Sequence, residues 1–348
     1  MKILIPIIFA IGILSTVFSI SISAQESYDI PGWIKNTAGW WANDEIDDAS
    51  FVNAMKFLIQ NDIMQIESSE STFTEYPDNG DFYLTYRPNP NSLYTGDQTA
   101  EAFLRNSGLL EAEIEFLNSN FRLPHDVEII AQECNEINAF YDPTTKQISI
   151  CYELVDDIQE KYILFFYDVW GYTDDDFDMD VYDSYTLNVI DFIFWHEMGH
   201  AFIDIYQLPI TGLEENVADQ FAALMLLYYY DESTGDYSMG QTMVDDVGTW
   251  FNNSEYFISE IYPTLTGEEI LPAFWDVHAL DMQRFYNVSC YAYGFDPSSD
   301  SVAYLVEEGW LPQERAANCE WEYQQIEYSF AILLEPFDNG FFDYYFQS

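Results

Sequence analysis

The stretch His196-Glu197-Met198-Gly199-His200 determines the predicted fold of this chain, because it places two imidazoles four residues apart with a carboxylate beside the first. On a helix, residues four apart lie on one face, so both imidazoles can bind a single metal ion. The glutamate can then take a proton from a water that the metal activates, a pattern typical of zinc hydrolases. The chain has only 4 histidines, which makes this spacing improbable by chance. The alternative is a helix that carries two ordinary polar histidines.

The residues around this motif predict a buried helix over residues 184–206, because large apolar side chains stand on both sides of it. A buried helix should not carry unpaired histidine and glutamate, since removing them from water costs on the order of several kcal/mol or shifts their pKa. A bound metal ion removes this conflict. Gly199 is a poor helix former and indicates a close approach by backbone or substrate.

A third ligand is expected after the turn at residues 207–212, where a second apolar helix begins. Glu215 and Asp219 are four residues apart on one face of that helix. Glu215 can therefore reach zinc while Asp219 accepts the second ring N–H of a ligand histidine. Glu214 is the competing ligand, but no aspartate follows it at the fourth position. Both glutamates could instead be acids that complement the helix dipole.

The first 24 residues predict export. Residues 1–24 contain one lysine, an apolar run from Ile3 to Ile20 and small residues before a plausible cleavage point, which is the pattern of a secretory signal peptide. The alternative is an uncleaved membrane anchor, since the apolar run approaches spanning length. The expected localisation is therefore secreted or extracellular.

The 4 cysteines agree with export, because an even number outside the cytosol indicates disulfides. Three pairings are possible. Cys134 and Cys151 flank a predicted hairpin and are therefore paired, which leaves Cys290 with Cys319. A four-cysteine zinc site is the alternative, but no two cysteines are close in sequence.

The formal net charge of −51, from 61 acidic and 10 basic residues, disfavours nucleic acid and anionic membrane surfaces as partners. Such a charge opposes compaction at low ionic strength and favours a saline exterior. A disordered acidic chain is the alternative, but 49% hydrophobic and 18% aromatic residues are enough for a core. The acidic run Asp174–Asp180 could bind calcium or could be a solvated loop.

Four segments are predicted along the chain. The signal peptide is followed by residues 28–67, a small helical module with its own aromatic core, which could pack on the main domain or contact an envelope component. Residues 68–81 are polar, contain Pro and Gly, and predict a linker. Residues 82–340 form the main domain, which we expect to be α+β, with a small, mainly antiparallel sheet, an active-site helix and a mostly helical C-terminal half.

Inside the main domain, strands are expected at residues 82–86 and 127–131, with a helix over 98–119 between them. Residues 140–141 and 147–150 flank a Pro-containing turn and predict a β-hairpin, followed by a helix over 152–166. An edge strand of this sheet could hold an extended peptide by main-chain hydrogen bonds beside the metal.

Several longer stretches resemble a known family. They are CNEINAFYDPTTKQISICYEL from Cys134, HEMGHAFID from His196, EENVADQFA from Glu214 and FWDVHALDMQRFYNVSCYAYG from Phe274. Through them, residues 82–335 resemble a family of secreted, largely uncharacterised prokaryotic proteins described as metallopeptidases, and more broadly the gluzincin-like zinc peptidases with a zincin-like fold. The ligand set of those peptidases implies His, His and Glu here. The interval between His200 and Glu215 is shorter than in the best-known gluzincins. Residues 28–67 resemble a short module of secreted archaeal proteins.

The resemblance also draws attention to His278. Zinc peptidases need a donor for the oxyanion that forms during hydrolysis, often a His or Tyr from a later helix. Here His278, Arg284 and Tyr286 are candidates. His278 could instead be a structural histidine bonded to Asp276 or Asp281, and Arg284 is expected to pair with one of the many acids.

Together these features predict a secreted zinc-dependent peptidase that acts on a peptide or protein substrate. His196, His200 and Glu215 are expected to hold one zinc ion, Asp219 to orient a ligand histidine, and Glu197 to act as general base. Two alternatives are kept open. One is a zinc amidase or esterase on a non-peptide substrate, and the other is a catalytically inactive binding protein on a metalloprotease fold.

Overall fold

The computed structural model describes residues 76–92, 99–228, 238–261 and 278–342, together with Trp41 and Lys56. The chain divides into two compact units, Met1–Thr72 and Phe73–Ser348, and all the elements from β1 onward belong to the second. The predicted signal peptide, and the predicted helical module apart from those two residues, lie outside the described part. Within that part, the helices are too short or too polar to cross a membrane.

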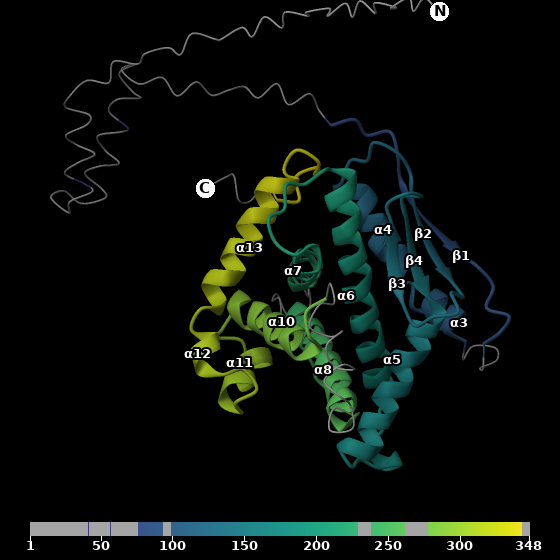
Figure 1. Ribbon diagram of the computed structural model, residues 1–348, viewed down its shortest axis with the longest axis vertical. Helices are drawn as coiled ribbons and strands as arrows, with labels where there is room; N and C mark the ends of the chain where they lie inside the picture. The colour runs from purple at the N-terminus through teal and green to yellow at the C-terminus, as the bar shows by residue number, and fades with distance from the viewer. Residues whose placement is uncertain are drawn as a thin grey trace, which may run out of the picture. The chain divides into compact units, whose positions relative to one another are not determined.

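A four-stranded sheet forms the N-terminal part of the second unit (Figure 1). Its strands are β1 (Phe82–Tyr86), β2 (Val127–Gln132), β3 (Ala139–Asp142) and β4 (Gln147–Cys151), in the spatial order β1-β2-β4-β3. β1 pairs with β2 and β2 with β4 in parallel, whereas β3 and β4 form the predicted antiparallel hairpin. The α+β class is confirmed, and β3 is an edge strand.

The expected strand directions need one correction, because only one of the pairings is antiparallel and the sheet is mixed. The cause is the connection between β1 and β2, which contains α3 (Ala100–Ser107) and α4 (Leu109–Asn120). A helical crossover returns the chain to the same end of the sheet, so the next strand runs parallel to the first. The single helix expected over 98–119 is divided at Gly108, whose φ of 70° is left-handed and ends α3.

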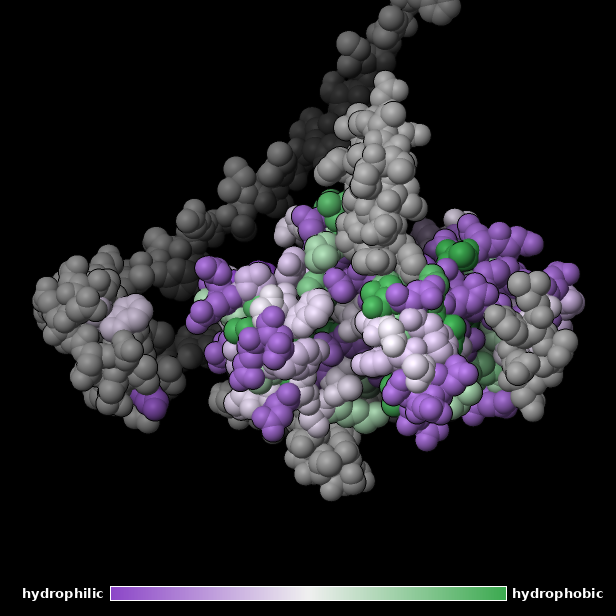
Figure 2. All heavy atoms as spheres, turned by 90° about the horizontal axis from the view of Figure 1, so that it is seen from below, coloured by the Kyte–Doolittle hydropathy of each residue, from purple (hydrophilic) through white to green (hydrophobic). Residues whose placement is uncertain are grey.

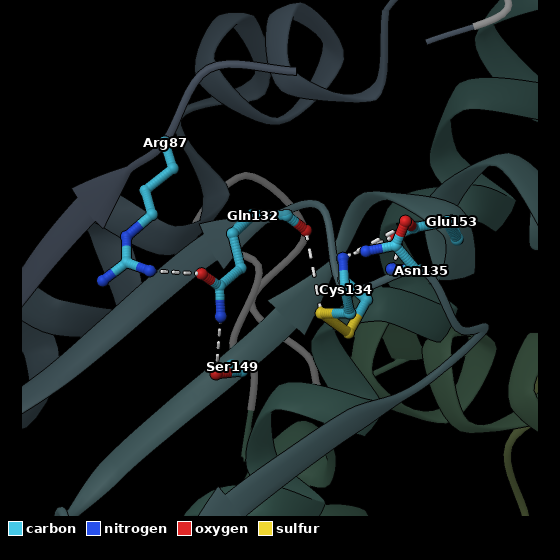
Figure 3. The surroundings of a disulfide bond; sticks show 7 residues. Arg87, Gln132, Cys134, Asn135, Ser149 and Glu153 are labelled. Atoms are coloured by element: carbon cyan, nitrogen blue, oxygen red, sulfur yellow. Dashed lines mark hydrogen bonds between the residues drawn. A yellow bond between two sulfur atoms is a disulfide. The ribbon is translucent and has the colours of Figure 1, made fainter. Parts of the chain in front are cut away.

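A disulfide between Cys134 and Cys151 ties the loop before β3 to the end of β4 (Figure 3). Glu153, at the start of α5 (Tyr152–Leu164), accepts hydrogen bonds from the backbone N–H groups of Cys134 and Asn135 at 3.1 and 2.7 Å. A disulfide of this kind typically contributes about 2–4 kcal/mol by restricting the unfolded chain. The hairpin that contains the edge strand is therefore held at its base.

The rest of the described part of this unit is mainly helical, with α6 running between the sheet and the C-terminal helices (Figure 1). The α-helices described after α5 are α6 (Met179–Ile205), α7 (Glu214–Leu227), α8 (Ser238–Ile261), α10 (Asp281–Phe295), α11 (Asp300–Glu307), α12 (Gln313–Ala316) and α13 (Cys319–Leu334). The second predicted disulfide, Cys290–Cys319, joins α10 to α13. Both expected pairings are therefore present.

The acidic run considered for calcium lies at η3 (Asp174–Asp176) and the start of α6, after the π-helix η2 (Phe165–Val169) that follows α5. Its carboxylates have local partners: Asp174 accepts from the hydroxyl of Tyr167, Asp176 from Thr173, and Asp178 caps α6. Within the described residues, no three ligand groups of this run converge on one point. Calcium binding by this run stays a prediction, because its described carboxylates do not form a ligand cluster.

The core is centred on α6, whose Phe192, Phe194 and Trp195 are at most 1% exposed. A helix that is apolar on most sides is stable only inside the protein, which agrees with the burial predicted from residues 184–206. The surface has the opposite character. In Figure 2, hydrophilic residues dominate the coloured surface, and hydrophobic residues show only as separate small groups. The apolar core and the hydrophilic surface together explain how a chain of net charge −51 still folds.

Candidate active site

Two helices, α6 and α7, supply the candidate site, and their close approach depends on Gly199. A Cβ atom at position 199 would lie 3.0 Å from the Cα of Ala218 and 3.3 Å from its Cβ. A larger residue would push α7 away, so the glycine allows the two backbones to approach closely. The first turn of α7, with Glu214 and Glu215, is thereby brought to the histidine motif.

Three ligand-type atoms converge between these helices: Nε2 of His196, Nε2 of His200 and Oε2 of Glu215. Each pair of these atoms is separated by 3.2 Å, so they form an equilateral triangle. Ligand atoms bound tetrahedrally at about 2.0–2.1 Å from a zinc ion are about 3.3 Å apart. The triangle therefore has the size that a zinc ion requires.

The hydrogen bonds of the two Nδ1 atoms show which nitrogen of each imidazole faces the centre of the triangle. Nδ1 of His196 lies 2.8 Å from Oδ1 of Asp219, and Nδ1 of His200 lies 2.8 Å from Oε1 of Glu214. Because a carboxylate accepts hydrogen bonds, each Nδ1 carries a proton and each Nε2 directs a lone pair at the centre. Three lone-pair atoms that face one point need a cation between them, either a proton or a metal ion. Two imidazoles and one carboxylate form a donor set of catalytic zinc.

Behind His196, the buried Asp219 has partners on two sides. Arg284 of α10 donates to Oδ2 of Asp219 from Nε at 2.8 Å and to Oδ1 from a terminal nitrogen at 2.6 Å. The same guanidinium lies 4.2 Å from the ring centroid of Phe251. Burial raises the pKa of Asp219, but Arg284 and His196 outweigh it and lower this pKa to about 2. Arg284 thus pairs with an acid, as expected, and keeps Asp219 ionised against the His196 ring.

The surrounding carboxylates make the histidines strong bases. Burial lowers the pKa of His196, but hydrogen bonds with Asp219 and Glu215 outweigh it and raise this pKa to about 9. Burial raises the pKa of Glu215, but hydrogen bonds with the histidines outweigh it and hold this pKa well below its usual value. Metal ligands must be unprotonated, so protons compete with a metal ion for these imidazoles and acid weakens metal binding.

Glu197 lies beside the triangle and is held by the edge strand. Its Oε2 accepts the backbone N–H of Tyr141 in β3 at 2.8 Å, and the residue is 7% exposed. Burial raises the pKa of Glu197, although the neighbouring histidines and the Tyr141 N–H oppose the change. A raised pKa makes a carboxylate a better general base near neutral pH.

The two candidates for the third ligand occupy different places. Glu214 contacts Nδ1 of His200 and has a side chain 51% exposed, whereas Glu215 completes the triangle with a side chain 18% exposed. His278 lies at the rim, with Nε2 2.9 Å from Oε2 of Glu215 and its side chain 46% exposed. Its ring stacks on that of His196 at a centroid separation of 6.1 Å.

Tyr286 is not brought to the site. It is partly buried on α10 next to Phe285 and is not among the residues that line the cleft. Tyr141 and Asp204 line the cleft instead, although neither was predicted from the sequence to be a site residue. The hydroxyl of Tyr141 donates to Asp204 at 2.7 Å, and Lys146 forms an ion pair with the same carboxylate. The four-residue spacing from His200 to Asp204 could have identified the aspartate, whereas Tyr141 depends on how β3 packs.

A cleft of about 1020 Å³ opens over the site. Its walls include the motif residues of α6, the first turn of α7, residues 139–141 of β3, and His278. Cavities that bind small molecules typically measure about 300–1,000 Å³, so this cleft has room for a substrate of several residues. The edge strand β3 therefore forms part of one wall of the cleft.

A protein-family model described as "Putative metallopeptidase" matches residues 91–334 of the chain. The matched range contains the whole histidine motif, the three acidic residues of α7 (Glu214, Glu215 and Asp219) and His278. Comparison with curated proteins and with solved structures gave no match.

Proposed function

Because the chain belongs to the family described as "Putative metallopeptidase", we propose that it is a secreted zinc-dependent peptidase whose zinc ligands are His196, His200 and Glu215. One observation carries this proposal. Two imidazole nitrogens and one carboxylate oxygen lie 3.2 Å from one another, with both imidazoles oriented by further carboxylates. Such ordering of ligands by outer hydrogen bonds is characteristic of zinc sites.

The chemistry then divides between the ion and the protein. A zinc ion held here would act as a Lewis acid, lowering the pKa of a water molecule to about 7 and polarising the substrate carbonyl. Glu197 would take the proton of the attacking water and deliver it to the leaving amine. The Tyr141 N–H holds one oxygen of Glu197, so the sheet fixes the direction in which this base works.

His278 and Arg284 have separate tasks in this proposal. His278 lies at the rim with a partly exposed ring, from which it can donate a hydrogen bond to the oxyanion of the substrate. Arg284 is committed to Asp219 through two hydrogen bonds. It therefore acts as a positioning residue, which holds Asp219 and through it the ring of His196.

The substrate is proposed to be a peptide in extended conformation, bound along β3. This strand is the edge of the sheet and lines the cleft next to Glu197. An extended chain can add to such an edge by main-chain hydrogen bonds, which do not depend on side-chain identity. A peptide placed there would pass its carbonyl groups over the triangle.

Secretion is part of the same proposal. The two disulfides are compatible with an oxidising exterior, and the apolar N-terminal run supplies the expected export signal. The strongly negative surface favours a saline environment, where exposed charges are screened.

The test is hydrolysis of casein and of a quenched fluorescent peptide by the purified protein. We expect activity that 1,10-phenanthroline abolishes and added zinc restores, and that Glu197→Gln lowers by at least about 10²-fold. The matched control Glu115→Gln removes the same charge from an exposed position on α4 and should retain full activity. Zinc binding without hydrolysis in the wild type would contradict the peptidase and favour the binding protein. Cleavage of simple esters or amides alone would favour the non-peptide hydrolase.

A further inference from the structure

A second cavity, of about 290 Å³, lies against α6 away from the cleft. Successive helical residues are about 100° apart, so Asp191 and Trp195 lie on the face of α6 roughly opposite to His196 and His200. The walls of the cavity include four aromatic side chains, one thioether and one carboxyl group: Phe116, Trp195, Tyr228, Phe341, Met225 and Glu113.

The aromatic walls stand nearly at right angles to one another. The ring of Phe116 meets that of Trp195 at 83° and that of Phe341 at 88°, with centroids 5.9 and 5.2 Å apart. Phe341 in turn meets Tyr228 at 75°. The four rings border one volume and so line a box. A cation inside it can lie against a ring face, because the face of an aromatic ring is electronegative.

The carboxyl group in the wall adds negative charge that is deeply buried. Glu113 is 4% exposed. Asp191 of α6 is 0% exposed and lies close enough for the charge of Glu113 to raise its pKa. Neither carboxylate oxygen of Asp191 has a hydrogen-bond partner among the residues that the structure describes. Burial raises the pKa of Glu113 to about 8, and burial and Glu113 raise that of Asp191. A positive charge in the cavity would favour the ionised form of this pair.

We propose that this cavity binds a small quaternary ammonium ion, with the aromatic rings around its methyl groups and Glu113 as its counter-charge. A primary ammonium is a poorer fit, because it needs acceptors for three hydrogen bonds and the walls offer few. The hydroxyl of Tyr228, for example, already donates to Glu327. A quaternary ammonium ion needs no hydrogen bonds and suits an apolar box with a single acid.

The test is isothermal titration calorimetry of the full secreted protein with choline and with 3,3-dimethyl-1-butanol. The two probes have the same shape and differ only in the charged nitrogen. Titration in about 1 M NaCl, where the Debye length is about 3 Å, suppresses choline binding to exposed acids. We expect choline to bind at least tenfold more tightly than the alcohol. Equal affinities, or no binding of choline, would overturn the proposal.

Variants locate the site. Glu113→Gln should weaken choline binding at least tenfold and leave the alcohol nearly unchanged, whereas the matched control Glu115→Gln, exposed on the same helix, should change neither. Phe341→Leu removes one aromatic wall without touching the acids and should also weaken choline binding, which keeps the test valid if Glu113→Gln fails to fold. Choline affinity that survives both variants, or that is lost only when Glu214→Gln alters the cleft, would place the ion elsewhere.

Discussion

The two faces of α6 carry buried carboxyl groups in contrasting states. Against one face lies Asp219, 6% exposed, with a pKa that Arg284 and His196 lower to about 2 against the effect of burial. On the other face lies Asp191, 0% exposed, with a pKa that burial and Glu113 raise well above its usual value. Burial is nearly equal at the two positions, so the difference comes from the cation beside Asp219.

This contrast shows how a chain with 61 acidic and 10 basic residues keeps a buried carboxyl group ionised at the candidate site. A buried carboxyl group stays charged only where a cation compensates it, and one of the few arginines lies at the proposed zinc site. Among the residues that the structure describes, no cation lowers the pKa of Asp191, and burial raises it. The helix therefore has an ionised carboxyl group against one face and, on the other face, a buried carboxyl group whose pKa is raised.

The largest effect on activity is expected at Glu197. Burial raises the pKa of this residue too, but His196 and His200 oppose the increase. Glu197→Gln should lower peptide hydrolysis by about 10²–10⁴-fold, the usual contribution of a general base. Zinc content and melting temperature should stay close to those of the wild type. Unchanged hydrolysis would show that this carboxylate, unlike Asp219, has no task at the site.

Removing the Arg284 guanidinium should make the pKa of Asp219 rise, as burial raises that of Asp191. Arg284→Met leaves Asp219 buried without its main partner, which typically costs about 3–5 kcal/mol. Zinc affinity should fall about 10–100-fold, because the ring of His196 loses its orientation. Competition with a chromogenic chelator measures the affinity, and chemical denaturation measures the stability.

The double variant Arg284→Met with Asp219→Leu is the control for that experiment. Replacing both charges by apolar groups should recover much of the stability, since no uncompensated charge remains buried. Zinc affinity should stay low, because His196 still lacks its acceptor. Recovery of zinc affinity in the double variant would mean that the pair has only a structural role.

The opposite face should respond to pH rather than to metal. The folded-state pKa of Glu113 is about 8 against an ordinary 4.5, so the folded protein binds more protons than the unfolded one between these values. Its contribution to stability is complete below about pH 4.5 and is lost as the pH rises through about 8. Glu113→Gln cannot ionise, so at pH 9 it should gain on the order of 1–3 kcal/mol relative to the wild type.

Thermal unfolding of both proteins at pH 5, 7 and 9 measures this difference, with Glu115→Gln as the exposed control. A difference between Glu113→Gln and wild type that is the same at every pH would show that Glu113 is ionised in the folded protein, and the contrast between the two faces would then fail.

The smallest effect is expected at Glu214, which orients His200 from an exposed position while Asp219 orients His196 from a buried one. An exposed hydrogen bond is weakened by solvent screening. Glu214→Gln should therefore lower zinc affinity less than tenfold and less than Asp219→Asn does. Equal losses in both variants, measured by chelator competition, would mean that burial does not set the strength of these contacts.

Local sequence was enough for features that depend on nearby residues. The four-residue spacings of His196 with His200 and of Glu215 with Asp219 placed each pair on one helix face, and the hairpin at residues 139–151 was predicted from its turn. Tertiary packing decided the rest. The parallel pairing of β1 and β2 depends on a crossover, and the contact of Tyr141 with Glu197 joins residues 56 apart in sequence.

The same limit applies to the roles of neighbouring acids. Glu214 and Glu215 are adjacent in sequence and chemically identical, and only the direction of the first turn of α7 distinguishes them. Asp191 and Glu113 could not be paired from sequence at all, because they lie on α6 and α4 and meet only in the folded core.

Zinc content of the purified protein, determined by inductively coupled plasma mass spectrometry, tests the central claim most directly. We predict one zinc ion per chain in the wild type and in Glu214→Gln, and none in Glu215→Gln, with all three proteins folded as judged by their melting temperatures. A wild type without zinc, or a Glu215→Gln variant that retains zinc while Glu214→Gln loses it, would contradict the assignment of the metal site.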